Sequence, residues 1–167
     1  MTKGRKAPII ILVSIDTTQG DVYMELKRVE SKSEVEAYIS KLKYALQNGA
    51  KITFQIDRQV DENRNIKNTN RYTVATLFPD ESPEIALKKE LLSLSVEEYQ
   101  CTVKDERFPK RSEMRVFGRT YNCSDDVYIK IRVELMDPTN YGNHTAFIMS
   151  FHFAEIPFNE SDFPYRT

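Results

Sequence analysis

The clearest pattern in the chain is a two-residue alternation of apolar and polar side chains in its last third. It runs through residues 114–121, 127–135 and 146–153. Two residues is the period of a β-strand, and these runs are rich in β-branched and aromatic side chains. The middle run has its apolar set at Val127, Ile129, Ile131, Val133 and Leu135. The pattern therefore predicts three antiparallel strands of one sheet, with one face packed on a core.

The same alternation assigns the remaining side chains of these runs to two faces. Facing the core we expect Met114 and Val116 from the first run, and Phe147, Met149, Phe151 and Phe153 from the last. The other face is expected to be open and to carry Arg115, Phe117, Arg119, Tyr121, Tyr128, Lys130, Arg132, Ser150 and His152. Cations, aromatic rings and a histidine on one surface suit phosphate contacts and proton transfer.

Two other stretches show the spacing of amphipathic helices. The first opens with a capping-box pattern at Ser33 and stops before Asn48-Gly49, so we expect a helix over residues 34–47. The second follows Ser82-Pro83 and is expected at about 83–92. Together with the strands, they predict an α+β fold: a twisted antiparallel sheet with two main helices packed on one face.

The segments between these elements give further predictions. Residues 51–56 alternate and predict a strand, whereas residues 69–77 fit either a strand or a short helix. Residues 101–112 are charged, contain a proline and are expected to form a loop. Residues 1–32 are interpreted as an N-terminal extension to a domain that spans residues 33–167.

Composition fits a globular domain with a substantial core. The 167 residues are 40% hydrophobic and 29% charged, with a formal net charge of −1. Residues 107–132 nevertheless hold seven cations and three anions, a local net charge of +4. Because local charge decides contacts with phosphates more than the total does, the near-neutral chain is compatible with a nucleic-acid partner.

Cysteine usage and hydropathy bear on the cellular compartment. Cys101 and Cys123 lie far apart without metal-ligand spacing, and we expect free thiols in a reducing cytoplasm. The apolar run at residues 7–13 is short, contains a proline and lacks a signal-peptide cleavage site. No stretch reaches the length of a membrane span. The sequence therefore predicts a cytoplasmic protein with no membrane partner.

Four short motifs that follow one another in a fixed order indicate a resemblance to a known family. Leu94-Ser-Val-Glu-Glu-Tyr99, Met114-Arg-Val-Phe-Gly118, Val127-Tyr-Ile-Lys-Ile131 and Ile148-Met-Ser-Phe-His152 follow one another in this order. In this arrangement the chain resembles a divergent branch of the MqsR-type toxins of type II toxin–antitoxin systems. Those are small ribonucleases with the RelE fold. The resemblance covers residues 33–165 and implies a RelE-like sheet with two helices, a helical 69–77 stretch, RNA as substrate and an antitoxin protein as partner.

The resemblance also implies a mechanism that needs neither metal nor cofactor. Such toxins cleave RNA by attack of a ribose 2′-hydroxyl on the adjacent phosphate. The positions that match the family's catalytic residues are Tyr128, His152 in place of a lysine, and Arg115 in place of a glutamine. Cys101 falls where the family has a further lysine, and it cannot do a lysine's work. The clustering of Arg119, Lys130, Arg132 and Ser150 on the same predicted face indicates RNA binding.

Each candidate residue also has a purely structural explanation. A lone histidine such as His152 is more often a surface or core residue, a strand tyrosine often covers a sheet edge, and strand charges are usually solvated. The alternative function is therefore a non-catalytic RNA- or protein-binding module that retains the RelE-like fold. The near-neutral charge and Cys101 favour this alternative, whereas the ordered motifs and His152 favour the ribonuclease.

Overall fold

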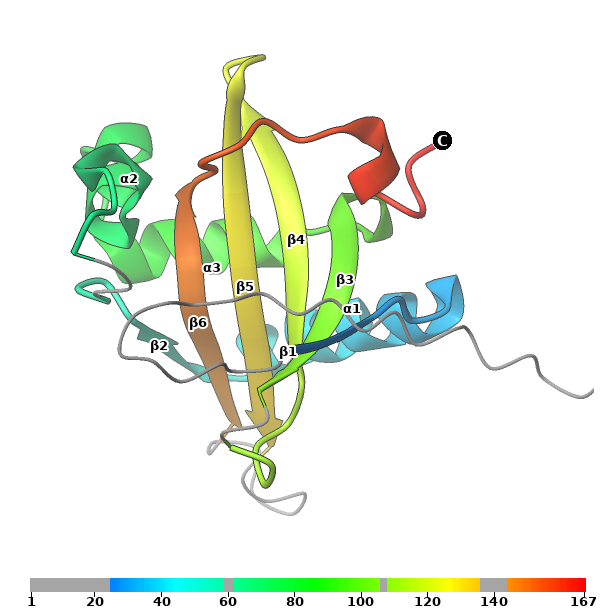
Figure 1. The fold of residues 1–167 in the computed structure, drawn as a ribbon. Helices are drawn as coiled ribbons and strands as arrows, with labels where there is room; N and C mark the ends of the chain where they lie inside the picture. The colour runs from blue at the N-terminus through cyan, green and yellow to red at the C-terminus, as the bar shows by residue number, and fades with distance from the viewer. Residues whose placement is uncertain (1–24, 59–61, 106–107, 136–143) are drawn as a thin grey trace, which may run out of the picture.

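In the computed structural model, which describes residues 25–58, 62–105, 108–135 and 144–167, the chain forms a six-stranded sheet (Figure 1). The strand order is β1-β3-β4-β5-β6-β2. The strands are β1 (Glu25–Arg28), β2 (Lys51–Phe54), β3 (Tyr99–Asp105), β4 (Met114–Tyr121), β5 (Asp125–Leu135) and β6 (His144–Phe153). The helices are α1 (Lys32–Gln47), α2 (Asn70–Leu77) and α3 (Pro83–Leu92), with short 3-10 turns η1 (Ile66–Asn68), η2 (Val96–Glu98) and η4 (Glu160–Asp162).

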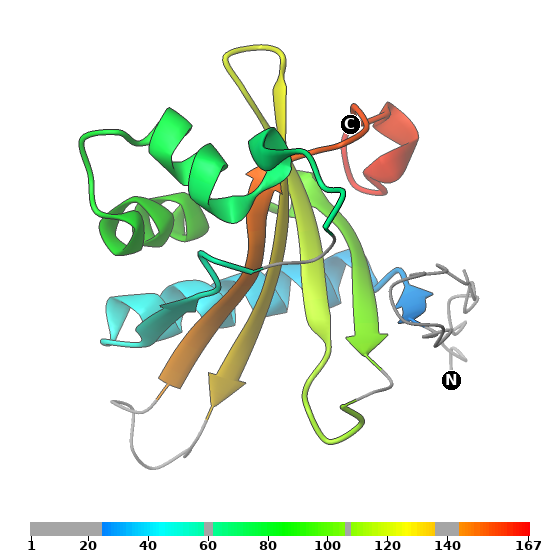
Figure 2. The ribbon, with the colours of Figure 1, turned by 60° about the vertical axis from the view of Figure 1, so that its left-hand side comes forward.

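The predicted α+β class is confirmed, and α1 and α3 pack on one face of the sheet (Figures 1 and 2). The prediction of a purely antiparallel sheet is wrong, because β2 pairs with β6 in parallel, from Lys51 opposite Thr145 to Phe54 opposite Ile148. Gly49, at φ 85°, turns the chain directly from the end of α1 into β2. The helix thus delivers β2 to the same end of the sheet from which β6 starts.

The predicted helices are present, with a small shift at the start of the first. Ser31, rather than Ser33, is the N-cap of α1: its hydroxyl accepts from the Glu34 amide, and the Glu34 carboxylate accepts from the Ser31 amide. Both serines have a glutamate three residues later, so the sequence pattern allows either box. The helix predicted at 83–92 matches α3, and α2 confirms the helical alternative for the 69–77 stretch.

Helix α2 covers the edge of β6 beyond the point where β2 ends (Figure 1). The Asn70 amide donates to the carbonyls of Gln55 and Met149 and accepts from the Phe151 amide, and Thr73 accepts from the Phe153 amide. Side chains of a helix therefore satisfy backbone groups that a seventh strand would otherwise pair.

The core lies between the sheet and α1 and α3, as the pattern of β5 predicted. Val127, Ile129 and Ile131 are buried against the helices, and Val133 packs partly buried beside them. The registers with β4 and β6 place Tyr128, Lys130 and Arg132 on the opposite face, called the second face below. The side chain of Leu135 lies outside the described residues.

The predicted orientation of β4 is wrong. Phe117 lies opposite Ile129 and is fully buried in the core, so Arg115, Arg119 and Tyr121 share the helix-covered face with it. Met114 and Val116 lie instead on the second face, in a smaller apolar cluster with Cys101 and Val103 of β3. Apolar residues occur at both even and odd positions of this strand, so the alternation alone allows either orientation. The large ring of Phe117 fills the core and decides between them.

Two register shifts account for the other differences. Between Lys130 and Ile131 of β5, the pairing with β6 slips by one residue. As a result Ala146 and Ile148 face the core, while Phe147 and Met149 border the second face. In β3 a shift between Tyr99 and Cys101 interrupts the alternation, and this strand occupies residues 101–105, the first part of the segment predicted as a loop. An extra residue in one strand reverses the faces of all that follow it.

The chain after β6 crosses the second face at the end where the β4–β5 hairpin lies (Figure 1). The rings of Phe158 and Phe163 pack over Gly118 so closely that a Cβ on Gly118 would lie 2.7 and 2.9 Å from them. Asp126 holds this segment by accepting from the Phe158 amide. Tyr165 then stacks on Tyr99 at the β3 edge of the sheet.

The predicted division of the chain at residue 33 remains a prediction. Strand β1, which precedes that position, pairs antiparallel with β3 and belongs to the same sheet. Residues 1–24, including the apolar run at 7–13, lie outside the described residues. Among the described helices, none is long and apolar enough to cross a membrane.

Candidate functional site on the second face

Five of the seven predicted site residues lie on the second face, and strand pairing brings four of them next to one another. Tyr128 of β5 lies opposite His152 of β6, and Lys130 lies opposite Ser150 one step along. The Tyr128 and His152 rings stack with centroids 5.4 Å apart and planes 26° from parallel. Ser150 and His152 are buried, with 1% and 7% of their surfaces exposed, while Tyr128 and Lys130 are half-buried.

The tautomer of His152 follows from its backbone contact. Its Nδ1 lies 2.9 Å from the Phe153 carbonyl oxygen, which can only accept a hydrogen bond. Nδ1 therefore carries the hydrogen, and Nε2 of the neutral ring has a free lone pair. A ring held in this way can accept a proton at Nε2, which is what a general base has to do.

The surroundings of His152 favour its neutral form. Burial lowers its pKa below the usual value of 6.5, because the protein interior solvates the imidazolium poorly. The positive charges of Arg64 and Arg58 lower the pKa further, and the Phe153 carbonyl and Glu155 act in the opposite direction. At pH 7 the ring is therefore neutral and ready to take a proton.

Two arginines of the site were not predicted. Arg58 follows β2 and donates from Nη1 to the Ser150 hydroxyl at 3.1 Å. Arg64 comes from the segment before η1, and its Nε lies 3.0 Å from a Glu155 carboxylate oxygen. Residues 57–68 are polar and have no periodic pattern that shows where a side chain points. Two arginines between a strand and a helix are the one signal that the sequence offers.

Arg132 lies on the second face but is already engaged. Its Nε is 2.8 Å from Glu134, its guanidinium lies 4.9 Å from the Phe147 ring centroid, and only 5% of its surface is exposed. An arginine neutralised and covered in this way offers little charge to a phosphate. The predicted RNA-binding role of Arg132 therefore has weaker support than that of Lys130.

Arg115 lies on the helix-covered face, away from His152, so its predicted placement is wrong. Its Nε and Nη2 donate to the two carboxylate oxygens of Glu30 at 2.8 and 3.2 Å, and its guanidinium covers the Tyr38 ring at 4.4 Å. Glu30 is itself buried and also accepts from Thr102. This closed ion pair joins β4 to the chain before α1, and gives no support to a catalytic role for Arg115.

Arg119 is likewise placed on the helix-covered face rather than beside His152. It donates from Nε and Nη2 to Glu98 at 2.5 and 2.9 Å, and from Nη1 to Glu90 at 2.8 Å. Tyr121 donates to the same Glu90 carboxylate, and burial together with that bond raises the tyrosine pKa. The cluster ties β4 to α3 and η2, which is a structural role.

The described side chains form no group of three or more His, Cys, Asp or Glu residues that could hold a metal ion. Cys101 is buried and Cys123 is exposed at the tip of the β4–β5 hairpin, and both are free thiols. The arrangement around His152 thus combines a neutral imidazole, a phenol, a hydroxyl, the Lys130 ammonium and the guanidinium groups of Arg58 and Arg64. These are groups that bind a phosphate diester and move a proton.

Comparisons with known proteins do not assign the chain to a family. No family model matches its sequence, no curated protein is significantly similar to it, and no solved structure significantly matches its fold.

Proposed function

We propose that the chain is a metal-independent endoribonuclease whose reaction takes place at His152. The observation that carries this proposal is the stacked pair of His152 and Tyr128, with Arg58 and Arg64 close enough to lower the histidine pKa. A neutral base beside positive charge suits a reaction in which a hydroxyl is deprotonated next to an anionic phosphate.

In the proposed reaction, Nε2 of His152 takes the proton of a ribose 2′-hydroxyl. The 2′-oxygen then bonds to the adjacent phosphorus, and the bond from phosphorus to the 5′-oxygen breaks. The 5′-oxygen leaves as a hydroxyl after taking a proton from water, so the products are a 2′,3′-cyclic phosphate and a 5′-hydroxyl. Histidine suits both directions of proton transfer near neutral pH.

The neighbouring groups have distinct parts in this reaction. Tyr128 is placed to donate a hydrogen bond to a phosphate oxygen or to stack on a base, since its ring lies against the imidazole. Arg58 and Arg64 offset the charge that develops on the phosphate, in place of the predicted Arg115. Binding a phosphate would require the Arg64 guanidinium to exchange its contact with Glu155, whose side chain is 55% exposed.

A toxin that is held inactive by an antitoxin protein is the biological role we propose for this activity. It is supported by the ordered motifs that resemble MqsR-type toxins and by an α+β sheet whose helices α1 and α3 lie on one face. A RelE-like arrangement of these elements is part of the same proposal. Cytoplasmic RNA would be the substrate.

A specific observation favours the alternative, a non-catalytic RNA- or protein-binding module. Ser150 and His152 are largely buried. Two arginines that were predicted to meet phosphates form ion pairs instead, Arg115 with Glu30 and Arg119 with Glu90 and Glu98. A binding module needs the remaining cations but no base that can reach a 2′-hydroxyl. The two functions therefore differ in whether bound RNA is cut.

Incubation of the purified chain with mixed single-stranded RNAs tests the proposal. We expect cleavage that persists in a metal chelator and leaves 2′,3′-cyclic phosphate ends, because the attacking group is the 2′-hydroxyl of the substrate. An RNA with 2′-deoxyribose at the cut position is the matched control and should remain intact. If the chain binds RNA but leaves it uncut, with or without ribosomes, the binding module replaces the ribonuclease.

A further inference from the structure

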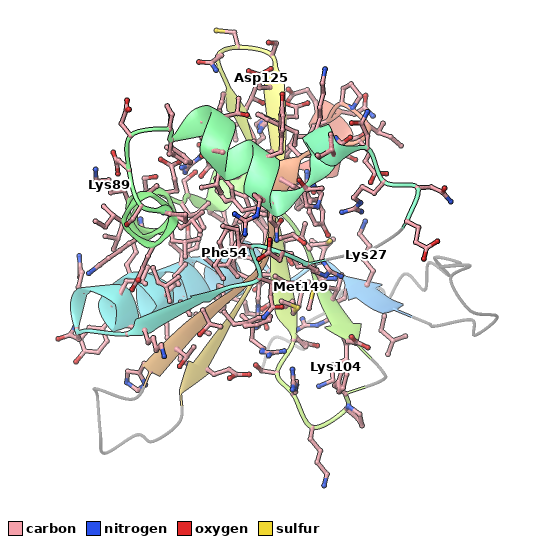
Figure 3. The ribbon with its side chains drawn as sticks, turned by 90° about the vertical axis from the view of Figure 1, so that its left-hand side faces the viewer. Lys27, Phe54, Lys89, Lys104, Asp125 and Met149 are labelled. Carbon is pink, nitrogen blue, oxygen red and sulfur yellow. The ribbon has the colours of Figure 1, made fainter. Side chains whose placement is uncertain are left out.

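The chain leaves β6 at the hairpin end of the sheet, beside the proposed site. Figure 3 shows Asp125, the first residue of β5, at the upper end of the sheet, and Met149 of β6 below it. Just past the end of β6, a carboxylate oxygen of Glu155 lies 3.0 Å from Nε of Arg64. In the free protein, Arg64 is thus bound to an acid of the segment that follows β6.

Both members of this ion pair act on the His152 ring. The positive charge of Arg64 lowers the histidine pKa, and the negative charge of Glu155 raises it. Because such effects fall off with distance, both charged groups lie near the imidazole. A phosphate bound at His152 would therefore approach the guanidinium that Glu155 occupies.

Glu155 differs in exposure from the acids that bind Arg119. The side chains of Glu90 and Glu98 are 20% and 17% exposed, and they hold Arg119 in a closed cluster. The Glu155 side chain is 55% exposed. Separating a buried pair leaves a charge without water or partner, whereas an exposed carboxylate is solvated as soon as it leaves. Glu155 can therefore turn into water when another anion takes its place on Arg64.

The backbone around Glu155 is fixed, so only its side chain has to move in this exchange. The Ala154 amide donates to the Asp126 carbonyl at 2.8 Å, and the Asn68 side chain donates to the Ala154 carbonyl at 3.2 Å. On the other side, the Phe158 amide donates to the Asp126 carboxylate. Rotation of an exposed side chain is fast, and it leaves these backbone bonds intact.

We propose that the Glu155 carboxylate competes with the RNA phosphate for Arg64 and so limits the affinity of the protein for RNA. The inference rests on the proposed function, since it takes the phosphate to bind beside His152. When RNA binds, a phosphate oxygen replaces the carboxylate on the guanidinium, and the carboxylate turns into water. A ligand without an anionic group cannot make this exchange and gains nothing from Arg64.

A set of charge variants tests this competition. Glu155→Gln removes the charge and keeps the size of the side chain. Glu160→Gln is the matched control, because Glu160 lies on the same segment and also pairs with an arginine, Arg166 at 3.4 Å. Glu155→Gln is also made in an Arg64→Ala protein. The probe is a single-stranded RNA dodecamer of mixed sequence, with 2′-O-methyl groups for binding and without them for cleavage.

We expect Glu155→Gln to bind the dodecamer about 2- to 5-fold more tightly than wild type, the value of a partly exposed ion pair. Glu160→Gln should bind as wild type does. In the Arg64→Ala protein, Glu155→Gln should have a much smaller effect, since no guanidinium remains to be freed. At saturating RNA the cleavage rate of Glu155→Gln should change less than its affinity, because the carboxylate has already left Arg64 in the complex.

Unchanged or weaker binding by Glu155→Gln would overturn this inference, and cleavage by wild type would leave the proposed function standing. An equal gain in the Arg64→Ala protein, or with Glu160→Gln, would also overturn it, because the acids would then act by general repulsion of RNA. A wild-type chain that binds RNA without cutting it removes the proposed ribonuclease, while tighter binding by Glu155→Gln would still support the competition at Arg64. A chain that binds no RNA removes both.

Discussion

Replacing His152 by alanine is expected to lower RNA cleavage by about 10²- to 10⁴-fold, the usual contribution of a positioned acid or base. The reason is that the substitution removes Nε2, the proposed proton acceptor. The Phe153 carbonyl keeps the ring hydrogen on Nδ1, and the nearby arginines favour the neutral ring. Single-turnover cleavage of a defined RNA by both proteins measures the effect. RNA affinity should change far less, because Arg58, Arg64 and Lys130 remain.

The matched control for this substitution is His144→Ala, which changes the other histidine of the chain. His144 lies at the opposite end of β6, where it pairs with Leu135 rather than with Tyr128. Its replacement should leave the rate of cleavage per folded molecule unchanged. Because His152 is buried, His152→Gln gives a second variant that keeps a polar side chain of similar reach. Full cleavage by a folded His152→Gln protein would remove the imidazole from the mechanism.

The second large effect concerns Arg119, for which the sequence and the structure predict opposite phenotypes. We expect Arg119→Ala to lower the free energy of unfolding by about 2–4 kcal/mol, because Glu98 and Glu90 lose their partner on the helix-covered face. The range is set below that of a fully buried pair since 15% of the arginine side chain is exposed. Chemical denaturation of both proteins measures the change.

Arg71→Ala is the control for this measurement. Arg71 also binds a carboxylate with two nitrogens, that of Asp57, but both side chains are more than half exposed. An exposed pair contributes about 0–1 kcal/mol, so this variant should unfold almost as wild type does. If Arg119→Ala were as stable as Arg71→Ala and instead lost RNA affinity, Arg119 would be a binding residue, as the alternation in β4 suggested.

The elements that could be predicted from the sequence are those whose stabilising contacts are local. α3 begins at a serine cap and a proline, and its predicted and observed bounds agree. β5 alternates without interruption between Val127 and Val133, so its two faces were assigned correctly. The stacked Tyr128 and His152 pair follows from this alternation and from the regular end of β6.

The remaining features depend on contacts that the local pattern does not contain. Arg115 can lie on the helix-covered face only because Glu30, 85 residues away, neutralises it there. The register shift at Lys130 and Ile131 reverses the faces of the first half of β6, and an extra residue leaves no mark in the composition of a strand. Arg58 and Arg64, which lower the pKa of His152, come from a polar segment without a hydrophobic period. The sequence therefore does not show which way their side chains point.

The most direct test of the central claim is a magnetic resonance titration of the His152 ring, assigned by comparison with a His144→Gln variant. In the free protein we predict a pKa below 6.5, because burial and the two arginines disfavour the imidazolium. Saturation with an uncleavable 2′-O-methyl dodecamer should raise this pKa, since a phosphate bound beside the ring stabilises its charged form. A pKa that stays the same when RNA is bound would contradict the placement of the RNA phosphate at His152.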